Sequence, residues 1–212
     1  MIKAIIFDFD MTLVDSLGVG NKAIEELRNK HKLEINMTEK EIWSTPHIPL
    51  MKKISEMNNN NPSWEEVMRL NRSAMERYYS ECIINEIEHL IKITNSGIYL
   101  GIISNNSREI INIVLTKNGN HKLKFGDVLG NEDCKDHSSK AGMINFLLEK
   151  YNFNKEDVMY VGDSEGDITS AVLAGVIPVG VVTGLHTKEE LKKAGASIIL
   201  NNLKWLLCYF TK

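Results

Sequence analysis

Cysteine is scarce in this sequence of 212 residues, which contains only Cys82, Cys134 and Cys208. An odd number of widely spaced cysteines fits neither the disulfide framework of a small secreted domain nor a zinc-binding pattern. We therefore expect reduced thiols and a cytoplasmic protein.

Long apolar runs are also missing. The N-terminus has only a short apolar run before Asp8, which is too short for the apolar segment of a signal peptide. The longest apolar stretch, 172–182, is interrupted by Gly175, Pro178 and Gly180 and is too short for a membrane span. We expect no association with a membrane.

Neither sign of charge dominates the sequence. The 25 Lys and Arg residues nearly balance the 28 Asp and Glu residues, which gives a formal net charge of −3. This balance offers no electrostatic basis for binding nucleic acid or an anionic membrane surface. Any site for an anion must therefore be built from a few well-placed residues.

What the sequence does contain is an alternation of strand and helix signals. It is 43% hydrophobic and 25% charged, as expected for a globular protein with a core. Short apolar runs rich in β-branched residues alternate with helical stretches, and they lie at 4–7, 98–103, 127–130, 158–161, 176–182 and 197–200. This alternation predicts an α/β fold with a doubly wound parallel sheet, whose strands are buried on both faces.

The strand-like runs disappear between 17 and 83, where helical signals replace them. Capping-box patterns begin at Thr38 and at Ser63. We predict a small all-helical cap domain of four helices at 17–83, inserted after the first strand. The catalytic core domain would then comprise 1–16 and 84–212.

Two aspartates follow the first predicted strand. In an open parallel sheet, ligands bind beyond the carboxyl ends of the strands, so polar residues at these ends are candidates for chemistry. The first strand continues into Asp8-Phe9-Asp10, and residues two apart in an extended chain project to the same side. We therefore expect Asp8 and Asp10 to face one site while Phe9 packs away from it.

Asp163 and Asp167 follow the strand at 158–161, so four aspartates would crowd one end of the sheet. Like charges so close together shift pKa values and oppose folding unless a cation lies between them. Ligation by oxygen alone suits Mg²⁺, and we predict a magnesium site. Any one of these residues could instead be a loop or helix-capping residue, and Asp167 could simply favour its helix N-terminus. Their joint placement at strand ends favours the metal.

Lys140 is the candidate cation for an anionic substrate. The apolar spacing after it predicts a helix over 140–151 that begins at this lysine. A cation at a helix N-terminus is unfavourable by about 0.3–1 kcal/mol, unless an anion binds beside it. A solvated surface lysine is the alternative, and Lys135 is a rival in the same loop.

Ser104 and Asn105 follow the strand at 98–103. The Ser104 hydroxyl and the backbone N–H groups here could bind phosphate oxygens. Both residues could equally be turn residues.

Together these motifs resemble the haloacid dehalogenase (HAD) superfamily, specifically its phosphatases with a helical cap, similar to phosphoglycolate phosphatase. The resemblance covers essentially the whole core. It runs through FDFDMTLVDS at 7–16, IISNN at 102–106, the lysine at 140 and YVGDSEGDITSAVLAGV at 160–176. The combination of these motifs is far more specific than any of them alone.

The resemblance implies a mechanism through an aspartyl-phosphate. Asp8 would be the nucleophile, and Asp10 would be the general acid and then the general base. Mg²⁺ would be held by the Asp8 carboxylate, the backbone carbonyl of Asp10 and Asp163. Asp167 would orient the metal shell or Lys140.

The resemblance also implies how the phosphoryl group is bound. Its oxygens would be held by Ser104, Asn105 and Lys140, and Thr12 would support the first loop. This sequence departs from the family where Lys140 is followed by Ala-Gly-Met instead of the usual proline. The usual Pro-Gly before the second core segment is also replaced, by Ile84-Asn85, and this second departure weakens the transfer of a specific substrate from phosphoglycolate phosphatase.

The residue at position 10 distinguishes the phosphatases of this superfamily from its dehalogenases. Its dehalogenases need no acid for a halide leaving group and lack aspartate at this position, so Asp10 favours phosphoryl transfer. We expect a magnesium-dependent phosphatase that hydrolyses a small phosphorylated metabolite. A phosphomutase similar to β-phosphoglucomutase and a non-catalytic binding protein on the same scaffold are the alternatives. The sequence names neither the substrate nor the cap residues that contact it, and it allows a monomer or a homodimer.

Overall fold

The computed structural model describes residues 1–38, 41–42, 45, 47–117, 122–133, 137 and 139–209. Cys134 and Lys135 lie outside the described residues. The chain forms two compact units, one from Met1–Asp15 with Cys82–Lys212 and the other from Ser16–Glu81. We call the first the core unit and the second the helical unit, and each is described by itself.

The core unit is built on a parallel sheet. In the described part of the chain this sheet has six strands in the order β3-β2-β1-β4-β5-β6, and every neighbouring pair is parallel. The strands are β1 (Ala4–Phe7), β2 (Tyr99–Ile103), β3 (Asp127–Leu129), β4 (Val158–Gly162), β5 (Ile177–Val181) and β6 (Ile198–Leu200). From β1 the chain winds outward in both directions, which is a doubly wound sheet. The predicted fold class is confirmed.

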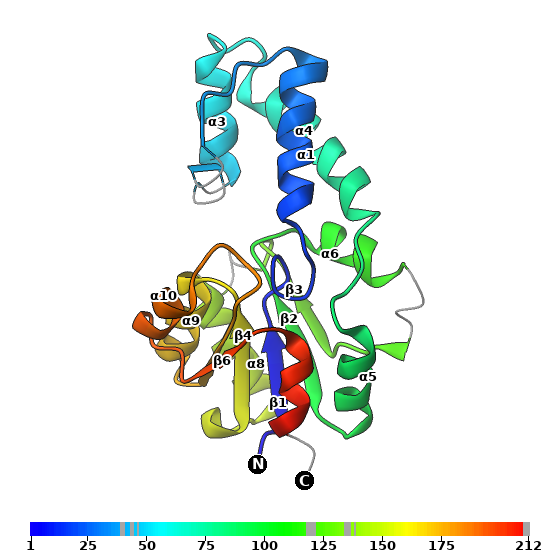
Figure 1. Ribbon diagram of the computed structural model, residues 1–212, viewed down its shortest axis with the longest axis vertical. Coiled ribbons are helices and arrows are strands. Elements are labelled where there is room, and N and C mark those ends of the chain that lie inside the picture. The colour runs from blue at the N-terminus through cyan, green and yellow to red at the C-terminus, as the bar shows by residue number, and fades with distance from the viewer. Residues whose placement is uncertain are drawn as a thin grey trace. The chain divides into compact units, whose positions relative to one another are not determined.

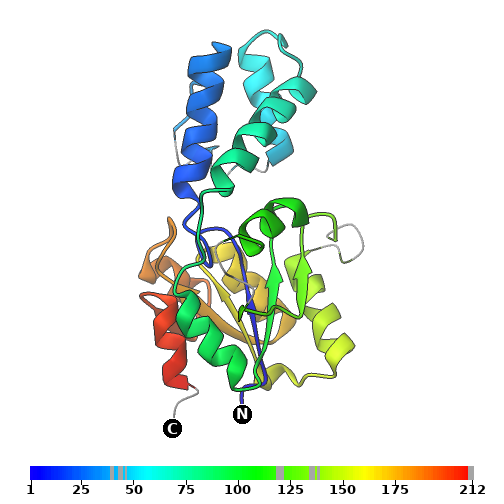
Figure 2. The same cartoon turned by 90° about the vertical axis from the view of Figure 1, so that its right-hand side faces the viewer.

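Helices cover both faces of the sheet (Figure 1). On one face, α8 (Lys140–Tyr151) and α9 (Glu165–Ala174) share a buried cluster with β1, β2 and β4. On the other, α5 (Ile87–Asn95) packs with the 3-10 helix Leu203–Tyr209, as Figure 2 shows. At the edges, α6 (Arg108–Leu115) packs on β3, and α10 (Lys188–Lys193) packs on β5 and β6.

The centre of the sheet is fully enclosed. All four residues of β1 have no exposed surface, and Val158, Tyr160 and Val161 of β4 are equally buried. Each large apolar side chain in such a position contributes about 1.5–3 kcal/mol to folding. The ends of β1 and β4 are therefore held in fixed positions by a packed core.

The helical unit contains α1 (Leu17–His31), α3 (His47–Met57) and α4 (Trp64–Tyr79). α4 packs against both α1 and α3, and its core includes Leu27, Ile54 and Val67. No helix in the described part of the chain is long and apolar enough to cross a membrane.

The two predicted capping boxes of this unit differ. At Thr38 both hydrogen bonds with Glu41 are formed. At Ser63 the side chain accepts a hydrogen bond from the Glu66 N–H, but the Glu66 carboxylate binds Arg69 instead of closing the box. The predicted helix after Thr38 lies partly outside the described residues.

Candidate active site at the carboxyl ends of the strands

A tight turn follows β1 and carries Asp8 and Asp10. The Asp8 N–H still bonds to β4, donating to the Val161 carbonyl at 2.8 Å. The chain then turns back at Met11, whose φ of 61° lies in the left-handed region. Asp8 is 4% exposed and Phe9 is fully buried, whereas Asp10 is half-buried. The turn therefore brings both carboxylates beyond the strand end while Phe9 packs into the core.

A hydrogen bond from the residues after β5 (Ile177–Val181) also holds this turn. Thr183, which follows β5, donates its hydroxyl to the Met11 carbonyl oxygen at 2.5 Å. A left-handed backbone at a non-glycine residue is strained by about 1–3 kcal/mol, so it requires support of this kind. The sequence gives no signal for this contact, because 172 residues separate the two partners.

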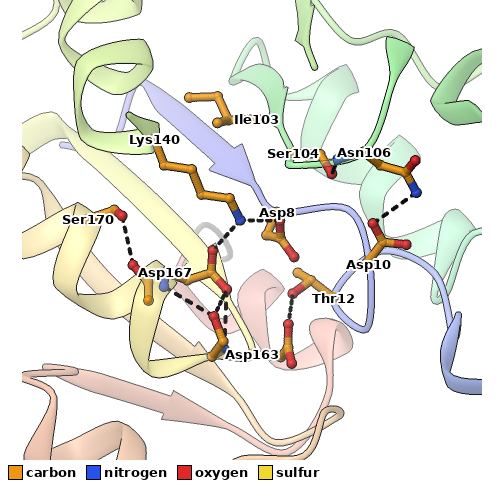
Figure 3. A network of polar contacts seen from close by, with 12 residues as sticks. Asp8, Asp10, Thr12, Ile103, Ser104, Asn106, Lys140, Asp163, Asp167 and Ser170 are labelled. Atoms are coloured by element: carbon orange, nitrogen blue, oxygen red, sulfur yellow. Dashed lines mark hydrogen bonds and ion pairs between the residues drawn. The ribbon is translucent and has the colours of Figure 1, made fainter. Parts of the chain in front are cut away.

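Lys140 lies at the centre of the site, reaching in from the first residue of α8 (Figure 3). Its Nζ atom lies 2.6 Å from Oδ1 of Asp8 and 2.7 Å from Oδ1 of Asp167. The side chain of Lys140 is only 12% exposed. Burial alone would lower the pKa of Lys140, but Asp167 and Asp8 raise it well above its ordinary value. The buried ammonium therefore stays charged, and the solvated surface alternative is wrong.

All hydrogen-bonding positions of the Asp167 carboxylate are in use. Oδ1 accepts from Lys140 and from the Tyr160 hydroxyl at 3.3 Å. Oδ2 accepts from the backbone N–H of Ser164 at 3.2 Å and from its hydroxyl at 2.5 Å, which closes a capping box at the start of α9. Because a carboxylate accepts about four hydrogen bonds, Asp167 is saturated by protein donors. The Lys140 ammonium is thus held between a saturated Asp167 and Asp8.

Two glycines make room for the aspartates that follow β4. A Cβ atom on Gly162 would lie 2.3 Å from Cβ of Asp167, and one on Gly184 would lie 1.8 Å from Oδ2 of Asp163. Both distances are far shorter than any contact that a side chain tolerates. The close approach of backbone and carboxylates therefore requires glycine at both positions.

Asp163 connects the β4 end to the turn after β1. Its Oδ1 accepts a hydrogen bond from the Thr12 hydroxyl at 3.3 Å. Burial and the neighbouring Asp167 raise the pKa of Asp163 to about 7, against the opposing effects of Lys140 and Thr12. Asp163 thus lies at the same end of the sheet as Asp8 and Asp10, as the sequence predicts.

Three carboxylates of this site could bind a metal ion. One oxygen from each of Asp8, Asp163 and Asp167 lies within 4.8 Å of the others, and all three residues are buried. Burial and Asp167 also raise the pKa of Asp8 well above its ordinary value, although Lys140 opposes this shift. The cluster therefore holds more negative charge than one lysine offsets, and its oxygen-only donors fit a hard divalent cation. Asp8 and Asp163 are the stronger candidates, because Asp167 is saturated.

Ser104 and Asn105 follow β2 on the other side of β1. Ser104 is 1% exposed, and its hydroxyl accepts the N–H of Asn106 at 3.0 Å. Asn105 is exposed. The contact to Asp10 comes from the next residue, Asn106, whose Nδ2 donates to Oδ2 of Asp10 at 3.2 Å (Figure 3). No role is predicted for Asn106 or Tyr160 from the sequence. The signal for Asn106 is its position just after β2, and Tyr160 lies inside β4, where the pattern of residues predicts only a core side chain.

Comparison with known proteins shows which family the chain belongs to. The model of the haloacid dehalogenase-like hydrolase family matches residues 5–181. The phosphoglycolate phosphatase of Vibrio cholerae is 23% identical, with 97% of this chain and 96% of that protein covered. That of Synechococcus elongatus is 28% identical, with 91% of this chain and 89% of that protein covered.

A solved structure has the same fold. The β-phosphoglucomutase of Clostridium difficile superimposes with a TM-score of 0.73 at 22% identity, and the match covers 99% of this chain and 96% of that one. The predicted resemblance is thus confirmed by the family match, the curated relatives and the fold. The two relatives from Vibrio cholerae and Synechococcus elongatus are phosphoglycolate phosphatases, and the chain itself belongs to the haloacid dehalogenase-like hydrolases.

Proposed function

We propose that this chain is a magnesium-dependent phosphatase that hydrolyses a small phosphorylated metabolite through an aspartyl-phosphate on Asp8. The observation that carries the proposal is the buried ion pair of Lys140 with Asp8 and Asp167, beside the carboxylate of Asp163. A buried cation beside a cluster of carboxylates, all at one end of the sheet, can bind a phosphoryl dianion and a divalent cation together.

The metal would be held by the Asp8 and Asp163 carboxylates and by the backbone carbonyl of Asp10. When bound, it would neutralise the charge that opposes attack by a carboxylate on a phosphate dianion. Lys140, Ser104 and Asn105 would bind the phosphoryl oxygens, and Thr12 would hold Asp163 in place through their hydrogen bond.

The reaction would have two steps, each balanced by one proton transfer. In the first, an Asp8 oxygen forms a bond to phosphorus while the bond from phosphorus to the leaving oxygen breaks, and Asp10 gives its proton to that oxygen. In the second, water forms a bond to phosphorus while Asp10 takes its proton, and the bond from phosphorus to Asp8 breaks. Phosphate leaves, and Asp8 is a carboxylate again. Dividing the displacement in this way is a known use of a carboxylate nucleophile.

The proposed substrate class is a small phosphate monoester, with 2-phosphoglycolate as the first compound to test because two relatives are phosphoglycolate phosphatases. The helical unit would act as a cap domain and select the substrate. A cytoplasmic setting and a monomeric or dimeric state are further parts of the proposal.

The test is release of inorganic phosphate from 2-phosphoglycolate, sugar phosphates, nucleotides and p-nitrophenyl phosphate, with Mg²⁺ and with EDTA. We expect activity that EDTA removes and that Asp8→Asn reduces by at least about 1,000-fold, since the nucleophile is lost. A folded protein that is inactive on the whole panel would contradict the proposal and support a non-catalytic role. Isomerised sugar phosphate without free phosphate would instead identify a mutase.

A further inference from the structure

Asn106 uses all four of its polar groups in hydrogen bonds. Its backbone N–H donates to Oγ of Ser104 at 3.0 Å, and its backbone carbonyl accepts from the N–H of Asn131 at 2.9 Å. In the side chain, Oδ1 accepts from the N–H of Ser107 at 3.0 Å, and Nδ2 donates to Oδ2 of Asp10 at 3.2 Å. One residue thus ties the loop after β2 both to the loop after β3 and to the turn after β1.

These bonds fix which way the amide faces. Only the oxygen of the Asn106 side chain can accept from the Ser107 N–H, so the nitrogen must be the atom directed at Asp10. Ser107 is itself fixed, because it is the N-cap of α6 and its hydroxyl accepts from the Ile110 N–H at 3.3 Å. The donor to Asp10 is therefore anchored to the start of a helix.

The position of Asp10 explains why a fixed hydrogen-bond donor to its carboxylate matters. It is half-buried, on a turn beyond the strand end, and its carboxylate is not part of the buried group formed by Asp8, Asp163 and Asp167 in the described residues. A group that transfers protons must stay within hydrogen-bond reach of the reacting oxygen. The hydrogen bond from Asn106 to Oδ2 restricts the rotation of the Asp10 carboxylate. A neutral amide can donate in this way whether Oδ1 carries a proton or not.

We propose that Asn106 is a positioning residue that holds Asp10 for proton transfer to the leaving oxygen, an inference that rests on the proposed function. It makes a specific prediction about leaving groups. An alkoxide is a poor leaving group and depends on the proton from Asp10, whereas p-nitrophenolate leaves without it. Loss of the Asn106 donor therefore impairs the hydrolysis of alkyl phosphates more than that of p-nitrophenyl phosphate.

The experiment compares kcat/KM for an alkyl phosphate and for p-nitrophenyl phosphate, since kcat/KM reports the steps up to formation of the aspartyl-phosphate. Asn106→Asp keeps the shape and the acceptor for Ser107 but replaces the donor, and Asn106→Ala removes both without adding charge. For both variants we expect kcat/KM to fall about 10- to 100-fold with the alkyl phosphate, as expected for a displaced general acid. With the aryl phosphate the fall should be less than about threefold.

Ser107→Ala is the matched control. It weakens the cap of α6 but keeps the backbone N–H that orients Asn106, so the ratio of the two kcat/KM values should not change. The same selective loss in Ser107→Ala would overturn the inference, as would equal losses on both substrates, no loss, or a gain of activity in the Asn106 variants.

Asp10→Asn and Asp8→Asn separate this inference from the proposed function. If Asp10→Asn shows the alkyl-selective loss and the Asn106 variants do not, only the role of Asn106 fails. If Asp8→Asn keeps full activity, the proposed function itself fails.

Discussion

The Nζ atom of Lys140 lies 2.6 Å from Oδ1 of Asp8, although 132 residues separate them in the sequence. Lys140 begins α8 and Asp8 directly follows β1, so the contact joins two elements that the buried cluster of the core unit already packs together. In a buried ion pair each charge compensates the other. Loss of either one leaves an uncompensated buried charge.

Lys140→Met should reduce both activity and stability. We expect kcat/KM to fall at least about 100-fold because a donor to the phosphoryl group is lost. The free energy of unfolding should fall by about 3 kcal/mol because buried carboxylates lose their partner. Steady-state kinetics and urea unfolding measure the two effects.

Lys150→Met is the matched control, because Lys150 lies on the same helix and binds Asp127 at the same distance of 2.6 Å. Its side chain is 42% exposed, so water screens this ion pair, and its loss should change the stability far less than loss of Lys140 and leave the activity unchanged. Equal effects of the two substitutions would contradict a special role for Lys140.

The metal-free protein should lose stability as the pH rises. The pKa of Asp163 is about 7 in the folded protein, above the ordinary value of 3.8. A carboxyl group with a raised pKa favours the folded state when protonated, so its stabilisation is fully present below about pH 4 and is lost as the pH rises through 7. We expect the melting temperature in EDTA to fall between pH 5 and pH 8.

Mg²⁺ should remove most of this decrease in melting temperature, since it binds the ionised carboxylates. Thermal unfolding at both pH values, with EDTA or Mg²⁺, measures the effect. Asp163→Asn should make the EDTA series flatter. A fall in EDTA that Mg²⁺ leaves unchanged would argue against a metal at Asp163.

Two glycines in the same motif should respond to alanine with opposite signs. Gly162→Ala would place a Cβ atom 2.3 Å from Asp167, whereas at Gly166, inside α9, the nearest atom would be at an ordinary 3.7 Å. Gly162→Ala should therefore destabilise the protein by about 1–3 kcal/mol and displace Asp167 from Lys140, with a loss of activity. Gly166→Ala should stabilise it by about 0.5–1 kcal/mol, because alanine favours a helix. Urea unfolding of the two variants tests the difference in sign.

Thr183→Val should weaken the turn that carries Asp10. The substitution keeps the shape but removes the hydroxyl that bonds to the Met11 carbonyl, at a cost of about 1 kcal/mol. We also expect a lower kcat/KM, since the turn positions Asp10 and Thr12. Thr183→Ser keeps the hydroxyl and should behave like the parent protein in both assays. If serine and valine have the same effect, the hydrogen bond is not the cause.

The sequence predicts the sheet well and some helices poorly. All six strands lie within two residues of the predicted runs, because each is a short apolar run that stops at a polar residue. α5 is not predicted, and its N-cap explains why. Glu86 there has a left-handed backbone and makes no capping hydrogen bond through its side chain, so the usual signal for a helix start is missing.

The order of strands and polar residues along the chain determines a doubly wound sheet with Asp8, Asp10, Ser104 and Asp163 at one end, since the carboxyl ends of parallel strands meet at the same edge. Which groups bond to one another was decided only by tertiary structure. Asp167 is saturated and bound to Lys140, and Asp10 faces Asn106. These pairings depend on contact distances of 2.7 Å and 3.2 Å between segments that are distant in sequence. Such distances are set by core packing, which the local pattern of residue types does not encode.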